Sequence, residues 1–566
     1  MRNKFSMIFL FMVFFFSAFL FAEEDVALGS FQKGNEHLAT FDKNPLLKGI
    51  VLEGKEKDFK YGKVGEIQSY NLKLSRKEKH LKELLTPYLF SSNITKETIT
   101  SIKREIIQFY QKNGRPVIYV YTPPQDISSG ILQLVIIEGK IGSITVEGNK
   151  WFSDKTILSH MKQKPGDVIK SDILSENLYV INRNPFRNVE AVYTPGKKKK
   201  TTDIKLLTSD RIPFRIYTGA DNTGNDVTDR YRLFIGMNES NLLCIDEVIS
   251  YQFICSTHYD KFSAHTGYFT FPLPPGHIFT LYGGYSPVDS RFEIEGSPRV
   301  FRVHGYSAQA SFRYDIPFTA NGQLIHELMF GMDYKRTNNN LDYGTLPIQG
   351  RYVNLTQLML GYNLGYKTQQ TTTSLEIEGF LSPLRWLPGQ SKEDFRSLRI
   401  LAKNKYAYFR SSFSFLLEIY KKVHIDTYLR AQVATCNLLP SEQYGLGGYD
   451  TVRGYKERIV NVDNAFILNI ELKTPSFGPL AYMFSKKIDD RLEFLGFFDW
   501  GWGCKHKTVS VEHKYRSLLS VGPGFRYSIS PNIMARGDFG FRLKYLERVG
   551  LSMPNSRFHF SVILGF

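Results

Sequence analysis

From residue 211 to the C-terminus, apolar and polar side chains alternate along segments of about ten residues. The last segment is apolar at every second position from Phe558 to Phe566, and residues 466–472 set polar side chains opposite an apolar face. A period of two predicts strands with two different surroundings, and lipid outside with water inside predicts a membrane β-barrel. At about 22 residues per strand and connection, this region gives roughly 16 antiparallel strands, an even number as such barrels require.

The preceding region has the mixed pattern of two small α+β units. In each unit the apolar spacing predicts the order strand, helix, helix, strand, strand. The first unit has strand-like residues 49–52, helical stripes at 81–89 and 94–109, and strands at 117–121 and 131–137. The second has a strand at 141–146, helices at 153–161 and 173–181, and strands at 189–193 and 203–207. We therefore expect domains at residues 46–139 and 140–209, followed by the barrel at 210–566.

The N-terminus has the pattern of a secretory signal peptide. Arg2 and Lys4 precede a short apolar run, and the small residue Ala22 stands before the acidic residues that follow. We expect residues 1–22 to be removed and residues 23–45 to form a tail or linker; an uncleaved membrane anchor is the alternative. Export from the cytoplasm argues against ATP-driven chemistry.

The amino-acid composition excludes several other classes of protein. Hydrophobic residues make up 42%, aromatics 14%, and the mean hydropathy is −0.25, which excludes a bundle of membrane helices. The many aromatics exclude a disordered chain, and four Cys exclude a disulfide framework. Cys244 and Cys255 could face each other across a hairpin or stand as single barrel side chains. A soluble sandwich or propeller explains neither the signal peptide nor the aromatic last strand.

The net charge of +17 raises the question of an anionic partner. The basic residues are scattered, and the run Lys197 to Lys200 follows Pro195-Gly196 between two strand-like segments, so we expect a solvated hairpin tip. Export makes nucleic acid a poor partner. Anionic lipid headgroups, or an acidic stretch of a protein, fit the charge better.

Several motifs resemble a known family. They are Pro123-Pro124-Gln125-Asp126, the segments 130–134 and 137–141, Asn184-Pro185-Phe186, the segment 218–224, Val452-Arg453-Gly454-Tyr455 and Phe497-Phe498-Asp499-Trp500-Gly501. In this order they resemble the two-partner secretion transporters, the hemolysin and filamentous-hemagglutinin secretion/activation proteins of the BamA-like superfamily. The resemblance implies two POTRA domains before the barrel. Gly114-Arg115-Pro116 departs from the family's usual Gly-Tyr, and the plug helix of some members is not evident in residues 23–45.

The resemblance also implies a functional loop. In the family, the loop that carries the Arg-Gly-Tyr motif dips into the barrel, where its arginine meets an acidic residue of the inner wall. Strand alternation points Glu493 and Asp499 inward, and it points Glu471 inward on another strand. The expected loop lock is therefore Val452, Arg453, Gly454 and Tyr455 with Asp499. The terminal Phe566 resembles the sorting signal of the barrel assembly machinery.

These features imply a transporter in the outer membrane with POTRA domains in the periplasm. It would bind an unfolded partner exoprotein at POTRA strand edges and pass it through the pore, as a monomer among outer-membrane lipids. An assembly factor that inserts other barrels is the alternative, and it shares the fold and the loop motif. We expect no enzyme activity, cofactor or metal, because no nucleophile and base form a set and no Cys or His has metal-ligand spacing.

Overall fold

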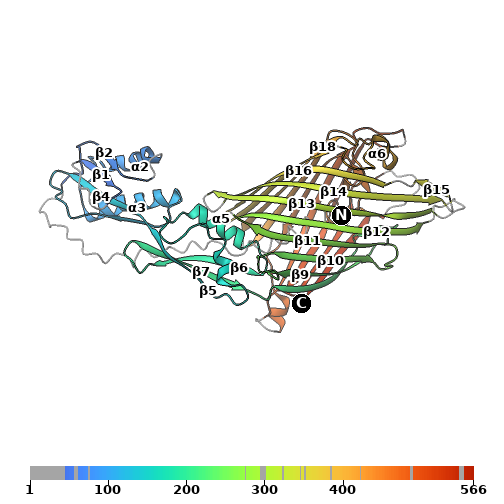
Figure 1. Ribbon diagram of the computed structural model, residues 1–566, viewed down its shortest axis with the longest axis horizontal. Coiled ribbons are helices and arrows are strands. Elements are labelled where there is room, and N and C mark those ends of the chain that lie inside the picture. The colour runs from blue at the N-terminus through green and yellow to red at the C-terminus, as the bar shows by residue number, and fades with distance from the viewer. Residues whose placement is uncertain are drawn as a thin grey trace. The chain divides into compact units, whose positions relative to one another are not determined.

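The computed structural model describes residues 45–566 except 56–61, 74–76, 275, 293–300, 321–323, 344–345, 350–351, 383–384, 421, 485–487, 511 and 547–553. The chain divides into two compact units, Met1–Arg211 and Ile212–Phe566 (Figure 1). The predicted signal peptide, and all of the predicted tail but its last residue, lie outside the described residues.

The first α+β unit holds one strand more than the sequence predicts. Its elements are β1 (Gly49–Glu53), β2 (Ile67–Tyr70), α2 (Glu78–Leu85), the 3₁₀ helix η2 (Thr86–Tyr88), α3 (Lys96–Lys112), β3 (Ile118–Tyr121) and β4 (Ile131–Glu138). The sheet order is β2-β1-β4-β3, with β1 parallel to both neighbours. Strand β2 escaped prediction because its sequence, Ile-Gln-Ser-Tyr, is short and polar, so only pairing with β1 defines it.

Helix α3 contains most of the apolar stripe predicted at 94–109, and its capping residues explain where it starts and ends. The Thr95 hydroxyl accepts a 3.2 Å hydrogen bond from the Thr98 N–H and thereby caps the N-terminus of the helix. At the other end Gly114 adopts φ +77, the left-handed conformation that glycine allows. Ile102 and Ile106 on the apolar face are fully buried against the sheet.

The Pro-Pro-Gln-Asp motif has a structural role in this unit. The Gln125 side-chain amide forms two 2.7 Å hydrogen bonds with the backbone of Gln133, one through its NH₂ group and one through its oxygen. The next residue, Asp126, accepts from the N–H and the hydroxyl of Ser128, and these hydrogen bonds lower the pKa of its carboxyl group. Gln125 thereby fastens the loop to β4.

The second α+β unit has the predicted order. It consists of β5 (Lys140–Glu147), α4 (Asp154–Leu158), α5 (Ser171–Ile181), β6 (Arg187–Pro195) and β7 (Thr201–Asp210), with the sheet order β5-β7-β6. Residues 196–200 connect β6 to β7, so the lysine run lies at the hairpin tip. Within the described part of the chain, no helix has the length and apolar character needed to cross a membrane.

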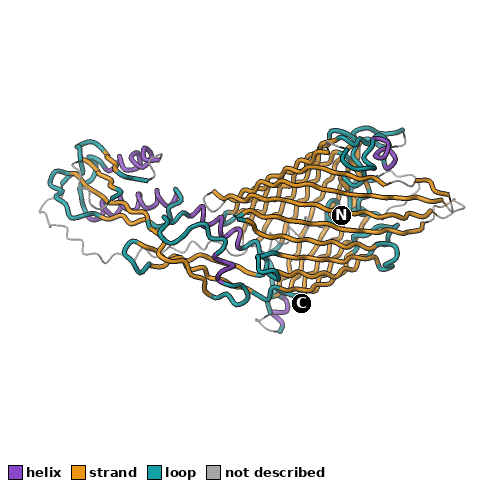
Figure 2. Tube along the Cα trace, in the orientation of Figure 1, coloured by secondary structure: helices purple, strands orange, loops and turns teal. Residues whose placement is uncertain are grey.

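The unit Ile212–Phe566 is a closed antiparallel barrel of 16 strands (Figures 1 and 2). In order around the barrel they are β8 (Phe214–Asp221), β9 (Arg232–Ser240), β10 (Val248–Ser256), β11 (Ser263–Leu273), β12 (His277–Phe292), β13 (Phe301–Ala320), β14 (Leu324–Tyr343), β16 (Tyr352–Lys367), β17 (Thr371–Ser382), β18 (Tyr406–Tyr420), β19 (Val423–Ala434), β22 (Asn464–Lys473), β23 (Asp490–Cys504), β24 (Tyr515–Ile529), β25 (Ile533–Arg542) and β26 (Ser556–Gly565). Strand β26 pairs with β8 and closes the ring.

Five shorter elements complete the described part of the unit. Strand β15 (Leu346–Gln349) pairs with β14, and helix α7 (Pro479–Met483) lies between β22 and β23. Helix α6 (Lys392–Leu398) lies in the connection from β17 to β18. Strands β20 (Tyr444–Leu446) and β21 (Val460–Val462) pair with each other within the connection from β19 to β22.

The predicted alternation is present, but the predicted strand length is wrong for part of the barrel. On β26, Phe558 is 48% exposed whereas His559 is fully buried, and β23 alternates in the same way. Strands β13 and β14 each span 20 residues rather than about ten. Their ends contain runs such as Thr-Asn-Asn-Asn, which resemble a loop in sequence and become strand by pairing with a neighbour.

The four cysteines are free thiols in the structure. Cys255 lies on β10 opposite Ser263, and the exposed Cys244 lies before that strand. Cys244 and Cys255 are therefore single side chains and do not face each other across a hairpin.

Candidate functional site

The site is formed by the long connection between β19 and β22, which folds back to contact the inner wall of the barrel. Its two arms meet as the short ladder of β20 and β21. Between them Gly447 and Gly448 adopt φ values of +94 and +107, which reverse the chain. A Cβ atom on Gly447 would lie 2.6 Å from the Lys456 carbonyl oxygen, so the turn also requires glycine for space. The two glycines and the pairing of β20 with β21 thus produce a compact hairpin with Arg453 near its tip.

Arg453 is almost completely buried and binds Asp499 on β23 by three hydrogen bonds. Its Nε and Nη2 donate to the two carboxylate oxygens over 2.9 and 2.7 Å, and its backbone N–H donates over 3.0 Å. The guanidinium carbon lies 3.5 Å from the centroid of the Phe497 ring, as in a cation–π contact. A bidentate pair with this geometry, in a site closed to water, holds the arginine in one orientation.

Two further carboxylates complete the binding site for the guanidinium. Nη1 of Arg453 lies 2.6 Å from Glu471 on β22 and 3.5 Å from Asp538 on β25. Arg526 binds both of these acids, over 3.2 and 2.8 Å, and Arg536 binds Asp538 over 2.6 Å. The acids are thus shared among several cations, so removing one partner leaves buried charge that the others compensate only in part.

The other residues of the motif fit the loop tip to the wall. Val452 is fully buried in an apolar cluster of the loop and the wall. The Tyr455 hydroxyl donates to the Lys544 carbonyl over 2.5 Å. Gly454 packs closely enough that a Cβ atom there would lie 2.8 Å from the Cβ of Ser520. On the wall, a Cβ atom on Gly540 would lie 2.6 Å from the carbonyl carbon of Arg453, so both surfaces need glycine at the contact.

The structure brings together most of the residues that the sequence suggested for the lock. Arg453 meets Asp499, and Glu471, expected only to face inward, is a further partner of that arginine. Glu493 lies on the same face of β23 as Asp499 but stands opposite Arg526 in register, away from the Arg453 contact. Phe566 is exposed and exchanges backbone hydrogen bonds with Ile216 at the start of β8.

Two partners of Arg453 on the last two strands of the barrel were not predicted from the sequence. Asp538 follows an Arg-Gly pair that resembles many strand segments, and only barrel closure carries it to Arg453. His559 on β26 is fully buried, and its Nε2 lies 2.9 Å from the Arg453 carbonyl oxygen. Strand alternation could have identified these side chains as polar residues that face the interior. Their spacing in the sequence does not indicate which loop they contact.

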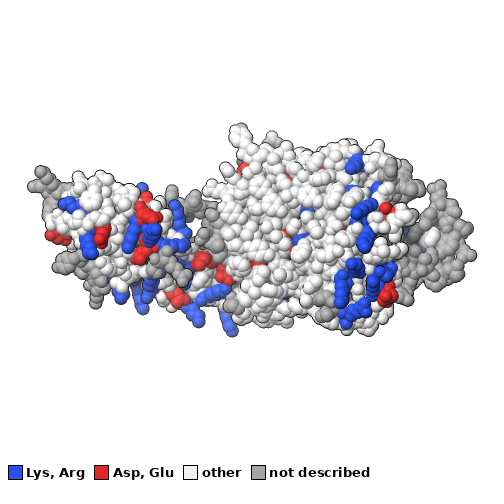
Figure 3. Space-filling view, turned by 90° about the horizontal axis from the view of Figure 1, so that it is seen from above, with Lys and Arg blue, Asp and Glu red and all other residues white. Residues whose placement is uncertain are grey.

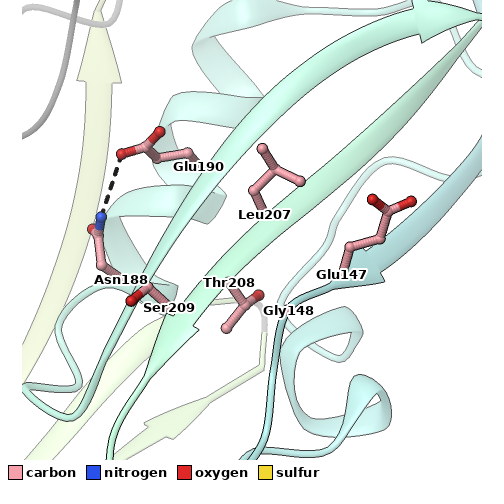
Figure 4. A pocket seen from close by; sticks show the side chains of 7 residues that line it. All are labelled: Glu147, Gly148, Asn188, Glu190, Leu207, Thr208 and Ser209. Atoms are coloured by element: carbon pink, nitrogen blue, oxygen red, sulfur yellow. Dashed lines mark hydrogen bonds between the residues drawn. The ribbon is translucent and has the colours of Figure 1, made fainter.

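The second α+β unit carries a separate cavity of about 340 Å³ on its sheet (Figure 4). Leu207 on β7 lies between Glu147 of β5 and Glu190 of β6, its register partners, and Asn188 and Ser209 complete much of the rim. The Glu147 carboxylate also binds Lys205 over 2.8 Å. The cavity therefore combines an apolar floor with acidic sides.

Comparisons with known proteins agree with this architecture. Heme/hemopexin transporter protein HuxB of Haemophilus influenzae (strain 86-028NP) is 25% identical over 471 residues, which cover 79% of this chain and 78% of the relative. Outer membrane transporter CdiB of Dickeya dadantii (strain 3937) is 24% identical over 68% of this chain and 69% of its own. The solved structure of CdiB from Escherichia coli matches the fold with a TM-score of 0.76 at 19% identity, covering 94% of this chain and 92% of that one.

Family profiles match three consecutive regions of the chain. The ShlB-type POTRA domain matches residues 66–139, and a POTRA domain described as surface antigen variable number repeat matches residues 139–207. The profile of haemolysin secretion/activation protein ShlB/FhaC/HecB matches residues 200–527. Since this last match covers more than half of the sequence, the chain belongs to the ShlB/FhaC/HecB family of haemolysin secretion/activation proteins.

Proposed function

We propose that this protein is an outer-membrane transporter that secretes an unfolded partner exoprotein through its barrel. Residues 46–139 and 140–209 act as its POTRA domains in the periplasm, and residues 210–566 form the pore. The observation that carries the proposal is the combination of the secretion-family match with a closed barrel of 16 strands whose interior is lined by polar and charged side chains. In a hydrated interior, water can form hydrogen bonds with the backbone of an unfolded polypeptide that passes through the barrel.

Arg453 serves as the lock that keeps the loop against the wall while the substrate passes. The contact with Asp499, Glu471 and Asp538 spans β22, β23 and β25. Glu442 of the same connection also binds Lys335 on β14 over 2.5 Å, so the loop is attached to several strands of the wall. Each attachment is charge-assisted and shielded from water, which favours a single docked position.

The partner would dock on strand edges of the POTRA domains. Strand β6 is at the edge of its sheet, and β2 and β3 are at the edges of the first one. An extended segment that adds to β6 gains backbone hydrogen bonds whatever its sequence. The neighbouring cavity at Leu207 suits the aliphatic stem of a Lys or Arg side chain, with Glu147 and Glu190 near its cation.

Deletion of this gene would distinguish a transporter from a barrel assembly factor. We expect the partner exoprotein to disappear from the medium and other outer-membrane barrels to keep their normal levels, as judged by quantitative proteomics of membrane and medium. Re-expression of the full chain should restore secretion. Depletion of the other barrels would instead favour an assembly factor, the second function compatible with this fold.

A further inference from the structure

A cluster of lysines at one end of the barrel has no role in the loop lock. Lys403 and Lys405 lie just before β18, Lys507 follows β23, and Lys514 precedes β24. All four are exposed, and none of the ion pairs found among the described residues involves them. On the barrel face drawn in Figure 3, the charged side chains lie towards the end that carries α6, whereas the broad middle of the barrel is almost uncharged.

Backbone hydrogen bonds hold these lysines in one neighbourhood, although they come from different connections. The buried Asn437 accepts from the Lys403 N–H through its carbonyl oxygen at 3.3 Å. Its side-chain amide donates to the Lys507 carbonyl over 2.8 Å and accepts from the Lys507 N–H over 2.7 Å. The Lys505 N–H donates to the Lys514 carbonyl over 2.9 Å, which joins the fourth lysine to the group.

Two other cations of this region are already neutralised. Lys505 pairs with Glu512, and Arg399 forms a bidentate pair with Asp463 beneath the connections. The Arg399 pair also fixes the loop that carries Lys403 to the connection that carries Asn437. The four lysines therefore supply the unneutralised charge, on a framework that the other ion pairs hold in place.

The strands next to the lysines present an apolar surface to the outside of the barrel. Phe409 on β18 and its register partner Val433 on β19 are 59% and 63% exposed. Tyr515, at the start of β24, is 59% exposed and stacks on Trp502 at a centroid distance of 6.4 Å. Exposed apolar and aromatic side chains on a membrane barrel contact lipid, with aromatics at the boundary. The lysines therefore lie at the height of the lipid headgroups.

We infer that Lys403, Lys405, Lys507 and Lys514 form a basic rim that binds the phosphate groups of lipids in the leaflet surrounding this end of the barrel. A lysine ammonium is a point charge on a long stem, so it can extend from apolar surface towards a headgroup phosphate. An acidic protein segment would match the charge but not the lipid-facing apolar strip directly beside it. The inference requires a membrane-embedded barrel and does not depend on what the barrel transports.

The test compares lipid binding by purified full-length protein and by two triple variants. One variant is K403Q/K405Q/K507Q, and the control, K197Q/K198Q/K199Q, removes the same charge from the hairpin tip of the second POTRA domain. Binding of diphosphorylated lipid A in detergent is followed by native mass spectrometry. At about 1 kcal/mol, or roughly fivefold, per lysine, the rim variant should bind roughly 100- to 200-fold more weakly, and the control should match the unmodified protein.

Further arms identify the source of the phosphate and exclude misfolding. Lipid A stripped of phosphate should bind the unmodified protein as weakly as intact lipid A binds the rim variant. K403R/K405R/K507R should retain binding, because arginine keeps the charge, and heat-modifiable electrophoretic mobility should show a folded barrel in every variant. Equal losses in the two Gln variants would overturn the inference, as would equal binding of lipid A with and without phosphate. Tight binding of inorganic phosphate alone, or preference for an acidic peptide, would also contradict it.

Discussion

At the scale of single residues, Arg453 should be essential for secretion and dispensable for the barrel itself. Arg453→Ala leaves Asp499 without its bidentate partner, an uncompensated buried charge that costs about 3–5 kcal/mol, so the loop should leave the wall. The sixteen-stranded ladder does not depend on this contact. We expect secreted partner to fall at least tenfold in a culture assay, while the variant keeps the electrophoretic mobility of a folded barrel.

A matched control for this variant is Arg313→Ala. Arg313 on β13 pairs with Asp333 over 2.8 Å and is similarly buried, but both residues belong to the wall. If losing any buried ion pair stopped secretion, the two variants would behave alike. Normal secretion by the Arg453 variant would refute the lock.

Gly540 should be sensitive to a single added methyl group. A Cβ atom there would lie 2.6 Å from the backbone of Arg453, whereas a Cβ atom on Gly496 of β23 would have no neighbour within 4 Å. Gly540→Ala should therefore displace the loop tip and reduce secretion, and Gly496→Ala should not, although each adds one methyl to a barrel strand. Limited proteolysis of the loop would report the displacement, and equal protection in both variants would argue against a close-packed tip.

At the scale of elements, the sequence predicted the helices and strands that are defined by their own pattern of apolar residues. Alternation identified the lipid face of β26, and the apolar stripe at 94–109 identified α3. Prediction failed where pairing decides the structure, as for β2 and for the polar ends of β13 and β14. A short polar segment gains strand structure from a neighbour that the linear sequence does not identify.

Gln125 gives an element-scale prediction in the first POTRA domain. Gln125→Ala removes two hydrogen bonds to the mostly buried backbone of β4, which should cost about 1–3 kcal/mol and raise amide exchange in residues 131–138 roughly 5- to 150-fold. Asp126→Ala, next in sequence, loses only exposed local contacts and should leave that exchange nearly unchanged. Hydrogen–deuterium exchange on the full chain measures both, and similar exchange in the two variants would show that Gln125 does not secure the strand.

At the scale of the whole molecule, the candidate site depends on barrel closure. The motif and the inward face of β23 predicted Arg453 with Asp499, which are 46 positions apart. Asp538 and His559 lie 85 and 106 positions from Arg453, on strands that reach the loop only because the sheet curves round. Pattern analysis can assign each side chain to the interior, but the order of strands round the ring decides which interior residues meet.

If the lock holds the loop in place during transport, a covalent tether across the same contact should not reduce secretion below that of the Gly454→Cys variant alone. The Cβ positions of Gly454 and Ser520 are 2.8 Å apart, so a shift of about 1 Å allows a disulfide between Gly454→Cys and Ser520→Cys. The crosslink is mapped by mass spectrometry of peptides, and secretion is compared with and without reductant. Gly454→Cys alone controls for the added side chain. Secretion that stops in the crosslinked protein and returns on reduction would show instead that the loop must leave the wall for the substrate to pass.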